Sequence, residues 1–219
     1  MDETQLQFIA QQLRQPSGEA GREVGERMNA SNEAVNLAAI AALRVASHDR
    51  ILEVGMGNGA FVSRLLDADA SVRYAGCDFS ETMVEEARRR NAPFVESGRA
   101  EFYVAPAEAL PFADGTFDKA FTVNTVYFWE APARVLAEFR RVLRPGGTLL
   151  IAGRSRRTME NLPFVRYGFT LYSARELSEL LTGNGFSVLE TIEKPELTPS
   201  ATGSTLPLEM LVVRARVTP

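Results

Sequence analysis

The most informative stretch of the sequence is Ile51-Leu52-Glu53-Val54-Gly55-Met56-Gly57-Asn58-Gly59-Ala60-Phe61. An apolar run typical of a buried strand leads into three closely spaced glycines, and the pattern then changes to that of a helix. Glycines in such a turn allow a positive φ and let the backbone approach a bound ligand. The stretch therefore predicts a strand, a tight turn and a helix, with a ligand held over the turn.

Short apolar runs alternate with helical segments along most of the remaining chain. Strands are predicted at 50–54, 72–77, 101–104, 117–123, 147–152, near 186–192 and near 208–217. Helices are predicted at about 59–67, 80–90 and 132–143, and in the segment that follows Ser173. Apolar strands separated by helices predict an α/β fold with a doubly wound, mostly parallel, Rossmann-like seven-stranded sheet covered on both faces.

The first part of the chain has a different pattern. Apolar residues recur at helical spacing up to Pro16-Ser17-Gly18, and Ser31 is a candidate N-cap for a second helix. We therefore expect an N-terminal helical cap at 1–47 and a ligand-binding domain at 48–219. Near the other end, the proline-containing stretch 194–207 is typical of a loop.

Composition excludes several classes of protein. The net charge of −4 over 219 residues argues against a general nucleic-acid binder. A single cysteine and a single histidine exclude a disulfide framework and argue against a metal site. No apolar run is long enough to span a bilayer, and the acidic start of the chain is unlike a signal peptide. We expect a cytoplasmic protein; its oligomeric state is not indicated.

Two details of the glycine turn distinguish between ligands. In a dinucleotide-binding turn, G-x-G-x-x-G, the third glycine follows the second by three positions, but here Gly59 follows Gly57 by two. Glu53 also stands two positions before Gly55, where it would repel a pyrophosphate and suit a cation, such as a sulfonium that carries an amino group. A nicotinamide-dependent oxidoreductase is therefore the weaker alternative.

The glycine turn resembles motif I, E/D-x-G-x-G-x-G, of the class I S-adenosylmethionine-dependent methyltransferases. Three further segments resemble motifs of that family in the same order. They are Gly76-Cys77-Asp78-Phe79-Ser80 with Met83, Ala107–Phe112 with Gly115–Asp118, and Arg141–Gly147. The layout is most similar to compact bacterial members related to quinone-biosynthesis methyltransferases. The resemblance implies S-adenosylmethionine as cofactor and a small molecule as methyl acceptor.

The resemblance also implies which residues hold the cofactor. The acidic residue of the second motif, Asp78, would bind the ribose hydroxyls. The family often has an aspartate where this chain has Pro106, so the adenine contact would fall on the backbone N–H of Ala107, with help from Glu108. The expected cofactor-binding residues are Glu53, Gly55, Gly57, Gly59, Asp78, Phe79, Met83, Ala107, Glu108 and Asn124.

The fourth predicted strand ends in Asn124–Trp129, which should border the reacting centre because ligands of this fold bind at the carboxyl ends of the strands. We expect a substrate pocket lined by Tyr127, Trp129, Phe164, Tyr167 and Phe169, and hence an aromatic or largely apolar acceptor. By position, Tyr127 is the candidate catalytic residue. A non-catalytic protein that only binds S-adenosylmethionine is a further alternative, because cofactor binding itself needs no catalytic side chain.

Overall fold

The computed structural model, which describes residues 2–199 and 205–218, contains a seven-stranded sheet in the order β3-β2-β1-β4-β5-β7-β6. The strands are β1 (Arg50–Val54), β2 (Arg73–Asp78), β3 (Ala100–Val104), β4 (Phe117–Val123), β5 (Leu143–Arg154), β6 (Phe186–Pro199) and β7 (Thr205–Val217). Strand β7 runs antiparallel to both of its neighbours, β5 and β6, whereas the other neighbouring strands pair in parallel. The predicted fold class is confirmed.

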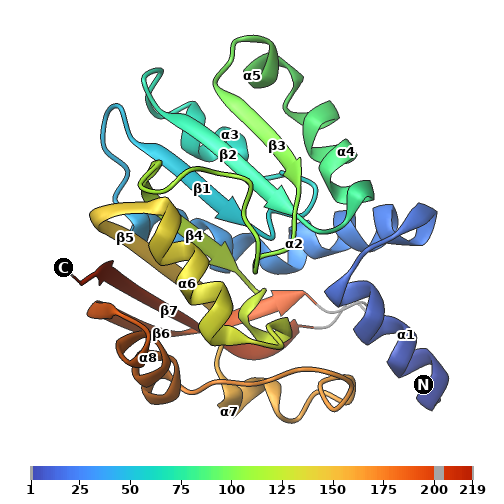
Figure 1. Ribbon diagram of the computed structural model, residues 1–219. Helices are drawn as coiled ribbons and strands as arrows, with labels where there is room; N and C mark the ends of the chain where they lie inside the picture. Colours follow the sequence, from blue (N-terminus) through green and yellow to red (C-terminus); the bar gives the residue numbers. More distant parts are fainter. Residues whose placement is uncertain (1, 200–204, 219) are drawn as a thin grey trace.

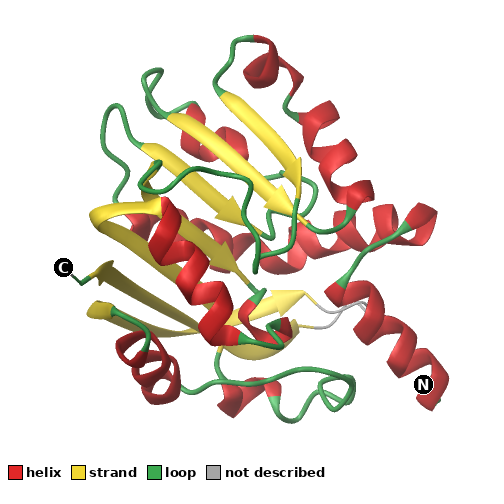
Figure 2. Cartoon of the chain, in the orientation of Figure 1, coloured by secondary structure: helices red, strands yellow, loops and turns green. Residues whose placement is uncertain are grey.

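Helices cover both faces of this sheet, as Figures 1 and 2 show. They are α1 (Glu3–Arg14), α2 (Gly18–Leu43), α3 (Val62–Leu66), α4 (Glu81–Arg90), α5 (Ala92–Glu96), the 3-10 helix η1 (Val126–Phe128), α6 (Pro132–Val142), α7 (Arg156–Met159) and α8 (Ala174–Gly183). Residues of α2, α3 and α4 pack on one face, and residues of α6 and α8 pack on the other.

The alternation of side chains along the central strands explains these two layers. In β1, Leu52 and Val54 join the core on the side of α6 and α8, whereas Ile51 joins the core on the side of α2. Successive strand residues point to opposite faces, and a strand covered on both faces must be apolar throughout. This is why β1 is apolar from Ile51 to Val54 except at Glu53, and only the exposed first residue, Arg50, lies outside the core.

Helix α2 begins earlier than expected from the candidate N-cap at Ser31. It is a single helix that begins after Ser17, and Ser31 lies in its interior, where its hydroxyl donates to the carbonyl of Met28 at 3.2 Å. The second half of α2 buries Val35 and Leu43 in the core of the sheet. This packing stabilises a longer helix than the local sequence signals favour. The division of the chain at residue 47 stays a prediction.

The stretch 194–207 was expected to be a loop, and this prediction is wrong for its described residues. Strand β6 continues through Pro195 to Pro199, and β7 begins at Thr205. Residues Thr205–Glu209 of β7 pair with β6 alone, so this end of the hairpin is a two-stranded ribbon. Prolines are tolerated in such strands because one edge of each needs no ladder hydrogen bond.

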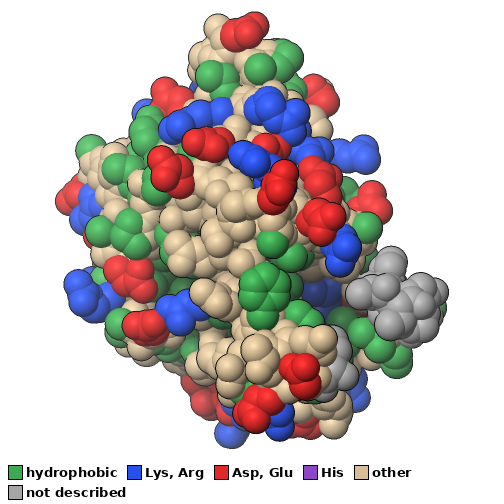
Figure 3. Space-filling view, turned by 90° about the vertical axis from the view of Figure 1, so that its right-hand side faces the viewer, with side chains coloured by type: hydrophobic (Ala, Val, Ile, Leu, Met, Phe, Trp, Pro, Cys, Tyr) green, Lys and Arg blue, Asp and Glu red, His purple; other side chains and the backbone are tan. Residues whose placement is uncertain are grey.

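Acidic and basic side chains alternate over the upper part of the face shown in Figure 3. Ion pairs join α2 and α4, among them Arg22 with Glu86 and Arg90 with Glu26. A mixed surface of this kind has no extended area of a single charge sign. In the parts of the chain that the structure describes, no helix combines the length and the apolar character that crossing a membrane requires.

Candidate functional site

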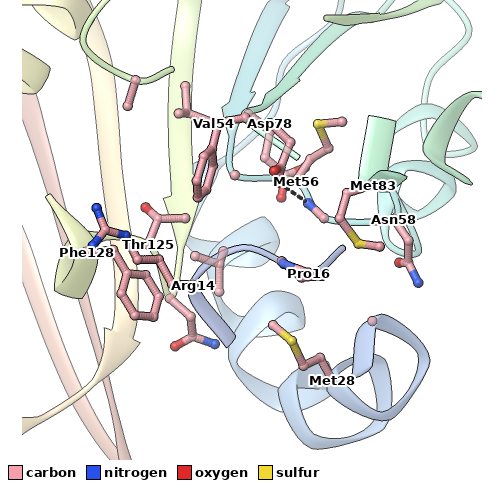
Figure 4. A pocket seen from close by; sticks show the side chains of 18 of the residues that line it. Arg14, Pro16, Met28, Val54, Met56, Asn58, Asp78, Met83, Thr125 and Phe128 are labelled. Atoms are coloured by element: carbon pink, nitrogen blue, oxygen red, sulfur yellow. Dashed lines mark hydrogen bonds between the residues drawn. The ribbon is translucent and has the colours of Figure 1, made fainter. Parts of the chain in front are cut away.

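A cavity of about 220 Å³ lies at the carboxyl ends of β1, β2 and β4, with α1 and α2 forming its opposite wall (Figure 4). Most of the residues expected in the site line it. They are Glu53, Gly55, Gly57, Asp78, Phe79, Met83, Ala107, Glu108, Asn124 and Trp129. Residues from four separate segments of the sequence are therefore brought together around one space.

The wall also contains residues that are not among the expected site residues. They include Leu13, Arg14, Pro16, Met28, Asn29, Asn32, Asn36, Met56, Asn58, Thr125 and Phe128. Those from α1 and α2 belong to no cofactor motif, and for most of them only the tertiary position reveals a place in the wall. One signal was available: Asn29, Asn32 and Asn36 fall on one face of a helix that is otherwise rich in alanine.

Each of the three positions in the turn requires glycine for a different structural reason. A Cβ on Gly55 would collide with the side chain of Thr125, and a Cβ on Gly59 would lie 2.7 Å from Nδ2 of Asn91. Gly59 therefore allows close packing against α4, and it does not line the cavity. A Cβ on Gly57, where φ is +56°, would meet no atom within 4 Å. Only at Gly57 does the missing side chain keep cavity space free.

Asp78, at the end of β2, connects the two loops that form this side of the cavity. Its Oδ2 accepts a hydrogen bond from the Gly57 N–H at 3.0 Å, and its Oδ1 accepts one from the Ser80 N–H at 2.9 Å. Burial raises the pKa of this carboxyl to about 6. Each oxygen keeps a lone pair for a further donor, so Asp78 can still accept hydrogen bonds from a ligand.

Glu53, on β1, is a second buried carboxyl in the wall, with 5% of its surface exposed. Its Oε2 accepts a hydrogen bond from the Tyr74 hydroxyl at 2.6 Å. Burial is the main cause that raises its pKa to about 7, and the nearby Asp78 contributes. Two carboxyl groups held close together out of water favour a cationic ligand, which would offset both the desolvation and their mutual repulsion.

Aromatic residues form the other end of the cavity. Phe128 and Trp129 line it, whereas Phe164 and Phe169 do not. Phe169 packs edge to face against Phe128, with ring centroids 4.6 Å apart, and Phe164 packs against Phe169. The loop after β5 thus supports the wall from behind. Tyr167 also lies outside the wall, and its hydroxyl donates to Glu3 of α1 at 3.1 Å.

Tyr127 does not line the cavity either, and the structure does not support a role for it as a catalytic residue. Its hydroxyl accepts a hydrogen bond from the backbone N–H of Arg154 and lies 3.1 Å from the carbonyl oxygen of that residue. Burial raises its pKa to about 12. A hydroxyl that is buried, engaged by the backbone and so weakly acidic is suited to fixing the end of β5.

Comparisons with known proteins agree with this geometry. Residues 52–151 match the model of the "Methyltransferase domain" family. An O-methyltransferase of Pyrenophora dematioidea is 30% identical over 77% of this chain and 65% of its own length. A ubiquinone/menaquinone biosynthesis C-methyltransferase of Paracoccus denitrificans is 35% identical over 55% of this chain and 49% of its own length. The chain thus spans less than two thirds of each relative.

A solved S-adenosylmethionine-dependent methyltransferase from Thermotoga maritima superimposes with a TM-score of 0.67 at 26% identity, over 88% of this chain and 94% of that one. Residues 52–151 thus belong to the methyltransferase domain family, and the relatives and structural neighbours support a class I S-adenosylmethionine-dependent methyltransferase. The predicted cofactor, S-adenosylmethionine, is likewise confirmed. The nicotinamide-dependent alternative is not favoured, because the comparisons point to methyltransferases.

The residues of this methyltransferase fold fit that cofactor. The free space over Gly57 would accommodate a ligand close to the backbone, and the lone pairs of Asp78 suit the hydroxyls of a ribose. The buried pair of Glu53 and Asp78 suits a ligand that carries positive charge. Within residues 2–199 and 205–218, no group of three or more His, Cys, Asp or Glu side chains could hold a metal ion.

Proposed function

We propose that this chain transfers a methyl group from S-adenosylmethionine to a small, largely apolar or aromatic molecule in the cytoplasm. The observation that supports this most strongly is that a single cavity contains both the cofactor motifs and an apolar end. Gly57 and Asp78 line it together with Leu13, Phe128 and Trp129. Such a mixture of apolar walls and a few polar groups is typical of small-molecule sites. The acidic net charge of −4 favours a small molecule over a nucleic acid as acceptor.

We propose roles for the wall residues from their positions. Asp78 would accept hydrogen bonds from the ribose hydroxyls, and Glu53 would pair with the ammonium group of the cofactor. The backbone of Ala107 and the side chain of Glu108 would contact the adenine, next to Pro106, which has no N–H to offer. Gly55, Gly57, Phe79, Met83 and Asn124 would complete the cofactor site.

S-adenosylmethionine supplies an electrophilic methyl group on a positively charged sulfur. The protein must then align the acceptor atom and exclude water, tasks for which Phe128, Trp129 and Leu13 are suited. The carboxyl groups in the wall are Glu53, Asp78 and Glu108, and all three belong to the proposed cofactor site. We therefore propose that alignment, not a side-chain base, provides most of the catalysis.

The proposal is tested by incubating the protein with S-adenosylmethionine and a panel of small hydroxylated aromatic compounds. Mass spectrometry would follow the formation of S-adenosylhomocysteine and of an acceptor heavier by one methyl group. Formation of both products together is expected with at least one apolar aromatic compound. Binding of the cofactor without turnover of any acceptor would instead support the non-catalytic alternative.

Replacement of Asp78 by alanine is expected to weaken binding of S-adenosylmethionine at least about tenfold. Hydrogen bonds to a charged group contribute roughly 1.5–3 kcal/mol each, and about 1.4 kcal/mol corresponds to a factor of ten. Isothermal titration calorimetry would measure the change in dissociation constant. Asp114→Ala is a suitable control because the side chain of Asp114 is 81% exposed and pairs with Arg141 away from the cavity. An unchanged dissociation constant for Asp78→Ala would remove Asp78 from the site.

Binding of S-adenosylmethionine is expected to weaken as the pH falls through about 7. The pKa of Glu53 in the free protein is about 7 and that of Asp78 is about 6, and the ligand requires both groups ionised. Protonation therefore competes with binding, and the dissociation constant should rise by up to about tenfold per pH unit for each group below its pKa.

Calorimetry between about pH 5.5 and about pH 7.5 would test this, because an α-amino group with a pKa near 7.7–8.0 stays mostly charged there. In Glu53→Gln, the dissociation constant should no longer change with pH near 7. It should still rise at lower pH, where Asp78 becomes protonated. A dissociation constant that does not change with pH in the unaltered protein would contradict the role of Glu53.

A further inference from the structure

Behind the wall of the cavity lies a buried ion pair that the cofactor motifs do not use. Arg154, at the carboxyl end of β5, donates from Nε to Oε1 of Glu196 on β6 at 2.6 Å. The two side chains are only 9% and 2% exposed, and neither residue lines the cavity. A buried pair contributes little net stability once the loss of hydration is included, so its effect on local geometry is more informative.

Two further donors of Arg154 contact one turn of α2. Its Nη2 donates to the carbonyl of Ser31 at 2.6 Å, and its Nη1 donates to Oδ1 of Asn32 at 2.9 Å. Asn32 is a wall residue of the cavity. The guanidinium therefore connects β5 and β6 to the part of α2 that faces the ligand space, and it determines where the Asn32 amide lies.

This contact also fixes which way the Asn32 amide is turned. A guanidinium can only donate hydrogen bonds, so Oδ1 must face Arg154 and the NH₂ group must face away from it. Within residues 2–199 and 205–218, no group accepts a hydrogen bond from Nδ2 of Asn32. Since Asn32 lines the cavity, the wall presents a donor that has no described protein partner.

The order of the strands places this donor at the acceptor end of the cavity. The cofactor motifs follow β1 and β2, whereas Arg154 ends β5, which is two strands beyond β1 in the order β2-β1-β4-β5. At about 4.8 Å per strand, this separation is roughly 10 Å. Phe128 and Trp129, which follow β4, come between. Asn32 therefore belongs with the apolar end and not with the glycine turn.

We propose that Asn32 recognises a carbonyl or carboxylate oxygen of the methyl acceptor through Nδ2, and that Arg154 and Glu196 are positioning residues for it. The inference rests on the proposed methyl transfer and adds the class of acceptor. The acceptor would have an apolar or aromatic body that packs against Phe128 and Trp129, and an oxygen that accepts a hydrogen bond beside α2. Asn32 is half-buried in the wall, and a wall donor that is left without a partner when an acceptor binds disfavours molecules that lack this oxygen.

The first test uses Asn32→Asp, because aspartate keeps an oxygen for Arg154 and removes the donor. The probes are para-hydroxyacetophenone and para-hydroxybenzoate, with para-ethylphenol as the matched molecule without the oxygen. Each is titrated into the protein saturated with S-adenosylhomocysteine. We expect the unaltered protein to bind at least one of the two oxygen-bearing probes about tenfold more tightly than para-ethylphenol, and Asn32→Asp to lose this preference.

Two controls separate recognition from folding. Glu33→Ala changes an exposed neighbour of Asn32 on α2 and should keep the preference. Asn32→Asp should keep the melting temperature and the dissociation constant for S-adenosylhomocysteine, since neither depends on the donor.

The positioning role is tested with Arg154→Lys. Lysine keeps a charge for Glu196 but lacks the planar fork that also reaches Asn32 and Ser31. We expect weaker binding of the preferred oxygen-bearing probe and unchanged binding of S-adenosylhomocysteine. Arg157→Gln is the matched control, because Arg157 pairs with Glu209 and is 74% exposed. Should Arg154→Lys fail to fold, the double variant Arg154→Met/Glu196→Leu removes both buried charges together and should show the same loss.

The outcomes distinguish this inference from the proposed function. If the unaltered protein binds neither S-adenosylmethionine nor S-adenosylhomocysteine, the proposed function itself is wrong. If it binds them but shows no preference for either oxygen-bearing probe, or binds none of the probes at millimolar concentration, only the inference is overturned. The same conclusion follows if Asn32→Asp keeps the preference.

Discussion

Replacing Gly57 with valine is expected to abolish binding of S-adenosylmethionine while the protein still folds. The new Cβ would meet no protein atom within 4 Å, so the side chain has room only because the cavity is there. A valine in that space would occupy the volume that the cofactor needs next to the backbone. We expect a loss of affinity of at least about a hundredfold, which corresponds to about 2.7 kcal/mol.

The backbone strain of this substitution needs a matched control. Gly57 has φ +56°, a conformation that costs a non-glycine residue about 1–3 kcal/mol. Gly115 has φ +61° and equally open surroundings, but it lies in the turn before β4, at the opposite end of the sheet. Gly115→Val should lower the melting temperature by a similar amount and bind the cofactor normally. Equal cofactor affinities in the two variants would show that the turn at Gly57 does not hold the ligand.

Removal of residues 1–15 is expected to leave cofactor binding nearly intact and to reduce methyl transfer at least about a hundredfold. This cut deletes α1, which contributes Leu13 and Arg14 to the cavity wall. It ends before Pro16, whose carbonyl accepts a hydrogen bond from the Ser80 hydroxyl at 2.5 Å. Without α1 the acceptor end would be open to water, and the acceptor would lose part of its alignment.

Calorimetry with S-adenosylmethionine and a turnover assay with the acceptor found in the panel would measure the two effects separately. Tyr167→Phe is a milder companion variant, because it removes only the hydrogen bond from the loop after β5 to Glu3 of α1. It should have a small effect on turnover. Full activity in the truncated protein would show that α1 does not close the site, and a parallel loss of cofactor binding would show that the cut damages the cofactor site itself.

Local sequence patterns are sufficient to predict the strands of the sheet and several of the helices that cover it. Strands β1 and β4 were predicted with the bounds that the structure has, and the helices at 80–90 and 132–143 differ by one residue at one end. A strand covered on both faces must be apolar throughout, and turns need glycine or a capping residue, so these elements are visible in a short window of sequence. The same locality explains why the sequence points to the motif residues Glu53, Gly57 and Asp78: each lies at or just after the carboxyl end of a predicted strand.

Long-range packing decided the other half of the site. Which aromatic residues face the cavity depends on how the segment after β4 turns, and it turns Phe128 inward and Tyr127 towards the backbone of Arg154. Likewise, Asn32 and Arg14 belong to no local motif, and they reach the cavity only because α1 and α2 pack across the strand ends.

The sequence by itself thus determined the sheet, the glycine turn and the proposed cofactor side of this protein, since each depends on neighbours in the chain. Only the tertiary structure decided the proposed acceptor side. Its residues come from α1, α2 and the end of β4, and contacts between such distant segments depend on burial and partner geometry that no short pattern encodes. The Arg154–Asn32 hydrogen bond, which joins residues 122 positions apart, is the clearest example.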